Sequence, residues 1–145
     1  MKFPIRIAFV EALGFELLRQ ENGEAEIGLP AREDQLNAWG VVHGGVTMTL
    51  LDTVMAHAAR SPVVGAEPDH RGVVTIEMKT SFMRPGEGRL VAHGKVLHKT
   101  NSFAFCEGSV FDSGDKRVAH ATGTFKYLKA LPSGGRKLKR QDASD

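Results

Sequence analysis

The hydrophobic and polar positions of the chain follow two different periods. Between residues 42 and 60 the apolar residues recur at helical spacing, and this is the one long stretch that predicts a helix. Elsewhere apolar and polar residues alternate, which is typical of strands with one buried face. The pattern predicts a short helix over 4–12 and six strands, over 14–19, 24–29, 73–83, 89–98, 103–111 and 117–127.

The long predicted helix has two apolar faces. At about 100° per residue, one face is mainly aliphatic and a second carries Asp52 among apolar residues, while the polar stripe consists of Thr49, Thr53, His57 and Arg60. A single antiparallel sheet wrapped around the helix would cover one apolar face, so the sequence predicts an α+β fold. The other apolar face needs a partner, for which a second subunit is the simplest candidate.

Composition places the chain among ordinary globular proteins. With 145 residues we expect one domain over 1–131, followed by a basic tail over 132–145 that is low in apolar residues and expected to be disordered. The net charge is +2. Positive charge is concentrated over 136–140, but no aromatic residues alternate with it, so we expect a solvated tail and neither a nucleic-acid nor a membrane partner.

Cysteine content and the first residues bear on the compartment. The single cysteine, Cys106, excludes an internal disulfide and suits a reducing compartment. Pro4, Arg6 and Glu11 interrupt the first apolar run, which therefore resembles neither a signal peptide nor a membrane span. We expect a cytoplasmic protein.

The start of the long helix holds the candidate chemistry. Gly44 and Gly45 stand at the predicted N-terminus, where backbone N–H groups are free and another molecule can approach the main chain closely. Asp52 follows two turns later in an apolar run. Donors aimed at an oxygen and a carboxylate within reach are the parts needed to add water to a carbonyl. The residues alone also allow a structural carboxylate and glycines that merely permit close packing.

Other reactive chemistry finds less support. The six histidines form no metal-binding pattern with one another or with cysteine, so no metal is expected. His43 lacks the Ser or Cys partner of a nucleophile–base pair, and Cys106 in mid-strand is expected to be a buried, inert thiol.

The segment Asn-x-x-Gly-x-x-His-Gly-Gly over 37–45, followed by Asp52, resembles the hotdog-fold acyl-CoA thioesterases of the phenylacetate-degradation (PaaI-like) type. The similarity extends over nearly the whole chain and includes residues 9–17 and 74–85. This resemblance implies a hotdog fold, in which an antiparallel sheet of about six strands wraps around one long helix. It also implies that two subunits join their sheets, with the active site at their interface, in a homodimer or homotetramer.

The resemblance assigns catalytic roles to five residues. Asp52 matches the catalytic carboxylate, acting as general base on water or as nucleophile, and the Gly44 N–H matches the donor that polarises the thioester oxygen. Asn37 matches a residue that positions water or substrate, and His43 is expected mainly to shape the loop. Thr75 matches a position that assists at the acyl end.

Five further residues are expected to bind substrate. Gly45 allows close approach beside the thioester, and the turn over 98–103 matches a segment that relatives use for coenzyme A. Lys99, Asn101 and Ser102 are its expected contacts, and Arg84 is a further candidate for phosphate.

We therefore expect hydrolysis of an acyl-CoA or aryl-acyl-CoA thioester to the free acid and CoA. No separate cofactor is expected, because CoA is part of the substrate. Two alternatives on the same fold are a non-catalytic acyl-CoA binding or sensing module and a CoA hydratase or dehydratase. The hydratase is disfavoured because the chain shows no His/acid pair in the expected arrangement.

Overall fold

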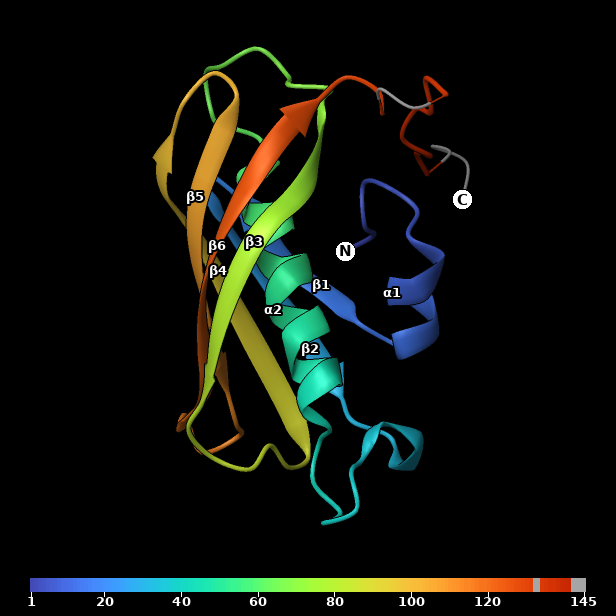
Figure 1. Ribbon diagram of the computed structural model, residues 1–145, viewed down its shortest axis with the longest axis vertical. Coiled ribbons are helices and arrows are strands. Elements are labelled where there is room, and N and C mark those ends of the chain that lie inside the picture. The colour runs from blue at the N-terminus through green and yellow to red at the C-terminus, as the bar shows by residue number, and fades with distance from the viewer. Residues whose placement is uncertain (132–133, 142–145) are drawn as a thin grey trace.

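The computed structural model describes residues 1–131 and 134–141 and has the predicted α+β architecture (Figure 1). Its helices and strands are α1 (Ala8–Leu13), β1 (Glu16–Glu21), β2 (Glu24–Pro30), a 3-10 turn (Glu33–Gln35), α2 (Gly44–Ala59), β3 (Gly72–Phe82), β4 (Arg89–Lys99), β5 (Phe103–Phe111) and β6 (Arg117–Leu128). The strands form one antiparallel sheet in the order β1-β2-β4-β5-β6-β3. All six strands and both helices were predicted, with small shifts at their ends.

The sheet curves around α2, and the core lies between them (Figure 1). Leu50, Leu51, Val54 and Met55 of α2 are fully buried. Two residues of the polar stripe, Thr53 and His57, are buried too. The N-terminal segment packs over His57, where the Phe3 ring lies edge-on to the imidazole with 5.1 Å between the ring centroids.

Three glycines of the sheet let α2 approach closely. A Cβ on Gly94 of β4 would lie 2.6 Å from the Val54 carbonyl oxygen, and one on Gly108 of β5 would lie 3.2 Å from side-chain atoms of α2. A Cβ on Gly123 of β6 would lie 3.1 Å from Met55. The sheet therefore meets the middle of the helix almost backbone to backbone.

The other side of α2 is open in the single chain. Strand β3 is an edge of the sheet, and Met48, Ile76 and Phe82 near it are 37%, 53% and 53% exposed. Exposed apolar residues along an unpaired edge strand are typical of an interaction site.

The C-terminal segment differs from the expectation of a disordered tail over the part that the structure describes, residues 134–141. The Arg6 N–H donates to the Lys139 carbonyl at 2.8 Å, and the Leu138 side chain lies against Gly72 at the start of β3. These contacts are distant in sequence, so local composition could not reveal them. The rest of the predicted tail, 132–133 and 142–145, lies outside the described residues. No helix in the described part of the chain is long and apolar enough to cross a membrane.

Candidate active site

Helix α2 begins at Gly44, and His43 caps it. The His43 Nδ1 accepts a hydrogen bond from the Gly45 N–H at 2.9 Å, and the His43 carbonyl accepts from the N–H of Val46. Within residues 1–131 and 134–141 the Gly44 N–H has no acceptor. The capping contact is consistent with a loop-shaping role for His43 and leaves the Gly44 amide as an available donor at the positive end of the helix dipole.

A tight loop precedes the helix, and the Asn37 side chain holds it together. The Asn37 Oδ1 accepts hydrogen bonds from the backbone N–H of Trp39 at 2.9 Å and of Val41 at 3.3 Å. The amide oxygen is thus used within the loop, and the expected contact of Asn37 with water or substrate stays a prediction for the rest of its side chain. Trp39 at the tip is 87% exposed, a feature that the sequence reasoning missed although it is the only tryptophan of the chain.

Asp52 and Thr75, both assigned to the catalytic site by the resemblance, lie in direct contact. The Thr75 Oγ1 donates to the Asp52 Oδ1 at 2.6 Å, across the gap between α2 and the edge strand β3. A register irregularity in the β3–β6 pairing follows Thr75 directly. The hydrogen bond fixes the position of the Asp52 carboxylate. Because Asp52 is only half-buried, the carboxylate also remains accessible to solvent.

Gly44 and Asp52 are not neighbours within one chain. Both lie on α2, and at a rise of about 1.5 Å per residue they are about 12 Å apart along the helix axis. Within a single subunit one carbonyl therefore cannot meet both groups, so the expected pairing of the Gly44 donor with the Asp52 carboxylate would need two subunits.

The predicted turn over 98–103 lies beside the C-terminal end of α2 and is tied to a segment that sequence reasoning did not consider. The Asn101 carbonyl accepts from Arg71 Nη1 at 2.7 Å, and the Ser102 carbonyl accepts from the Tyr127 N–H at 2.8 Å. The Lys99 ammonium lies 4.0 Å from a carboxylate oxygen of Asp69. Asn101 and Ser102 thus use their backbone carbonyls within the fold.

Arg84 lies elsewhere. Its backbone N–H donates to the Val118 carbonyl, in the connection between β3 and β4. This connection is at the opposite end of the sheet from the turn that joins β4 to β5 (Figure 1). The predicted phosphate contacts therefore form two separate groups in one chain.

Neither the thiol of Cys106 nor the hydroxyl of Tyr127 is suited to act as a nucleophile. Burial raises the pKa of Cys106 to about 12, which makes it a poor nucleophile, as expected. Burial likewise raises the pKa of Tyr127 to about 12, and its hydroxyl donates to the Ala59 carbonyl at 2.6 Å. In the part of the chain that the structure describes, no three His, Cys, Asp or Glu side chains are grouped to hold a metal ion.

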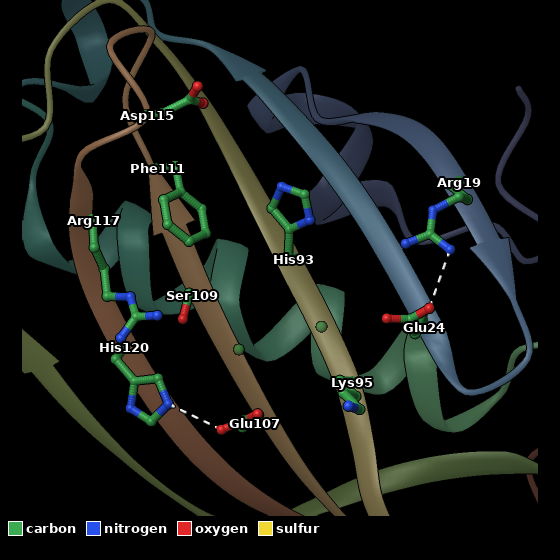
Figure 2. Close-up of a pocket in the computed structure, with 12 residues that line it drawn as sticks. Arg19, Glu24, His93, Lys95, Glu107, Ser109, Phe111, Asp115, Arg117 and His120 are labelled. Carbon is green, nitrogen blue, oxygen red and sulfur yellow. Dashed lines mark hydrogen bonds and ion pairs between the residues drawn. The ribbon is translucent and has the colours of Figure 1, made fainter.

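A hollow on the far face of the sheet is lined by charged side chains of both signs (Figure 2). His120 pairs there with Glu107 at 3.4 Å, and His93 pairs with Glu26 at 3.0 Å. None of the predicted site residues lines this hollow. Because the hollow lies on the face of the sheet away from α2 and holds no predicted site residue, we interpret it as a polar sheet surface separate from the candidate site.

Comparison with known proteins identifies the family. The family described as Thioesterase superfamily matches residues 40–119, which include the helix start, Asp52 and Thr75. The chain belongs to this thioesterase superfamily. A putative esterase from Halobacterium salinarum is 32% identical over 126 residues, covering 81% of this chain and 82% of the relative.

Two further similarities bear on the activity class and on the fold. The acyl-coenzyme A thioesterase PaaI of Escherichia coli is 26% identical over 114 residues, covering 77% of this chain and 76% of the relative. The solved structure of a conserved protein from Pseudomonas aeruginosa superposes with a TM-score of 0.78 at 32% identity, covering 86% of this chain and 97% of that one. The hotdog thioesterase fold is thus confirmed, and these relatives support a hydrolase of the thioester type.

Proposed function

We propose that this thioesterase hydrolyses an acyl-CoA or aryl-acyl-CoA thioester to the free acid and CoA. The observation that carries the proposal is the Asp52 carboxylate, held by Thr75 at 2.6 Å and accessible between α2 and β3. A carboxylate placed in this way can take a proton from water as the water oxygen attacks the thioester carbon. The C–S bond then breaks, the acyl group leaves as the acid, and CoA leaves as the thiol. Attack by Asp52 itself, followed by hydrolysis of the anhydride, gives the same products.

The active site is proposed to form between two subunits. A two-fold axis near Met48, about midway between Gly44 and Asp52, would place the two α2 helices side by side in opposite directions. Gly44 of the partner subunit would then lie near Asp52. Its N–H could polarise the thioester carbonyl while Asp52 takes a proton from the attacking water. Pairing of the exposed β3 edges would continue the sheet and cover Ile76 and Phe82.

The same axis would bring together the two groups of predicted phosphate contacts, which lie at opposite ends of one subunit. It reverses one subunit relative to the other, so Arg84 of the partner subunit would come to the end that holds Lys99. Both groups would then face one CoA molecule. The proposed assembly is a homodimer or, if two dimers associate, a homotetramer.

Release of free thiol from a panel of acyl-CoA and aryl-acyl-CoA esters tests the activity. Asp52→Asn removes the base or nucleophile but keeps the side chain's shape. We expect kcat to fall by at least ~100-fold with little change in KM. The variant must be shown free of deamidation. A near-normal kcat would remove Asp52 from the chemistry.

The panel also separates the alternatives. A binding or sensing module would bind the esters but release no thiol even as the unmodified protein. A hydratase would change the acyl group while leaving the thioester intact. Molar mass by light scattering tests the assembly, and an active monomer of about 15.7 kDa would contradict the shared site.

A further inference from the structure

Trp39 is presented to solvent by a loop that is itself fixed. Its side chain is 87% exposed, more than any other aromatic side chain among the described residues. The Asn37 Oδ1 accepts from the Trp39 N–H at 2.9 Å, and Gly40 turns the chain with a left-handed φ of 76°. The His43 N–H donates to the Gln35 carbonyl at 2.8 Å, which closes the loop onto the 3-10 turn. An aromatic ring on a preorganised loop loses little freedom on binding and is typical of an interface.

An apolar hollow lies at the other end of the molecule, where β3 begins and β6 ends. Its volume is about 220 Å³, enough to hold an indole ring. Its apolar lining comes from β3, β6 and the residues after β6, namely Val73, Val74, Leu128, Leu131 and Leu138. In the single chain this lining is open to solvent, and Leu131 is 39% exposed. Covering it with another apolar group would therefore be favourable.

The charges beside the hollow and beside the Trp39 loop are opposite in sign. Three cations line the hollow and form no ion pair among the described residues: Lys129, Arg136 and Lys137. The 3-10 turn that leads into the loop exposes Glu33 and Asp34. Arg32 pairs with Asp34 at 3.1 Å, so Glu33 supplies the uncompensated negative charge. Complementary charges favour contact between these two surfaces.

The proposed two-fold axis brings the ring of one subunit to the hollow of the other. Within one chain they cannot meet, because the connection before α2 and the C-terminal segment lie at opposite ends of the molecule (Figure 1). An axis near Met48 exchanges the two ends of α2, so the partner's loop would come to the end where the Tyr127 hydroxyl donates to the Ala59 carbonyl. Val73 and Val74 belong to β3, so the hollow continues the edge that is proposed to pair.

We infer that Trp39 of each subunit inserts its indole ring into the hollow of the partner subunit. The inference rests on the dimer of the proposed function and adds a specific contact at each end of the paired helices. A tryptophan that fills an apolar pocket with charged groups at its rim is a common energetic centre of protein interfaces. Leu131 and Leu138 form one wall of the hollow, so the segment after β6 becomes part of the subunit contact.

Fluorescence of the full chain tests the contact without any substrate, because Trp39 is the only tryptophan. We expect emission at a shorter wavelength than that of free N-acetyltryptophanamide, and weaker quenching by acrylamide. Leu131→Asp places a charge in the hollow and should shift the emission to longer wavelength. Leu18→Asp on β1 is the matched control, since Leu18 is 40% exposed, and it should leave the emission unchanged. Thermal unfolding checks that both variants are folded.

The dimer dissociation constant provides a second measurement. Trp39→Ala alters a side chain that makes no core contact in the single chain, so the variant should fold. We expect sedimentation equilibrium to show a dissociation constant at least about tenfold higher for Trp39→Ala and for Leu131→Asp, as for the loss of a tryptophan at the centre of a contact. Leu18→Asp should dimerise like the unmodified protein.

The two proposals fail in different ways. If Trp39 emits and is quenched like the free tryptophan derivative, the inference is wrong, even when CoA esters are hydrolysed. If the ring is protected and Leu131→Asp exposes it, but no ester of the panel is hydrolysed, the contact stands and the proposed function is wrong. If Leu131→Asp leaves the ring protected, Trp39 is buried elsewhere and the inference is overturned. Protection that appears only after CoA is added would assign Trp39 to the substrate and would overturn it as well.

Discussion

Two sets of glycines lie against the same helix and serve different purposes. Gly94, Gly108 and Gly123 lie beneath α2, where any Cβ would meet helix or core atoms at 2.6 to 3.2 Å. Gly44 opens the helix, and a Cβ there would meet only the Phe82 ring, at an ordinary 3.4 Å. The first set allows the sheet and helix to touch. At Gly44 the absence of a side chain instead leaves a backbone donor open to an incoming molecule.

This difference separates stability from activity along a single element. The side of α2 that faces the sheet contributes to stability, because its apolar side chains are buried against the sheet along the length of the helix. The side with Gly44 and Asp52 is open in the single chain and carries the candidate chemistry. Substitutions on the two sides should therefore affect different measurements.

The largest effect is expected from Gly94→Ala. The new methyl group would lie 2.6 Å from the Val54 carbonyl oxygen, a backbone atom that cannot move without displacing the helix. We expect the free energy of unfolding to fall by about 1–3 kcal/mol, which is the usual cost of overpacking. Denaturant unfolding measures it. An unchanged midpoint would show that α2 is not pressed against β4.

Gly44→Ala should produce the opposite result. Stability should hold or rise slightly, because alanine favours helix over glycine by up to about 1 kcal/mol. The methyl group would crowd the space in front of the amide, so we expect kcat/KM for a CoA ester to fall about tenfold, as for a weakened oxyanion donor. If activity persists while stability changes, Gly44 belongs with the packing glycines and the comparison fails.

The architecture could be predicted because it depends on local pattern. The alternation over 103–111 and 117–127 places one face of each strand in the core, and β5 and β6 occupy these ranges almost unchanged. The separation of Gly44 from Asp52 was also present in the sequence, since it follows from helical rise alone, and it agrees with the site between subunits that the resemblance implied.

The parts that were missed depend on contacts between residues far apart in the chain. Nothing near Leu138 indicates that it covers Gly72, and nothing near Arg71 indicates that its guanidinium reaches the Asn101 carbonyl. Asn37 illustrates another limit. An amide can bind substrate or its own backbone, and only the bonds to Trp39 and Val41 show which of these the Asn37 oxygen does.

The smallest expected effect concerns two histidines at opposite ends of α2. His43 is exposed at the helix start, whereas His57 is 1% exposed and its Nδ1 lies 2.7 Å from the Thr53 carbonyl. Burial lowers the pKa of His57 from 6.5 to about 4. Above pH 6.5 the ring is neutral in both the folded and the unfolded chain, so stability is independent of its titration.

Between pH 6.5 and about 4, His57 becomes protonated in the unfolded chain but stays neutral in the folded chain. Its titration therefore lowers the free energy of unfolding as the pH falls. His57→Gln can keep an N–H donor for Thr53 but does not titrate. We expect its stability, measured by denaturant unfolding from pH 7 to 4.5, to decline less steeply than that of the unmodified protein. The carboxylates titrate alike in both proteins and cancel in the difference. Equal slopes in the two proteins would mean that His57 takes up its proton as readily in the folded chain as in the unfolded chain, and hence that its buried site admits charge.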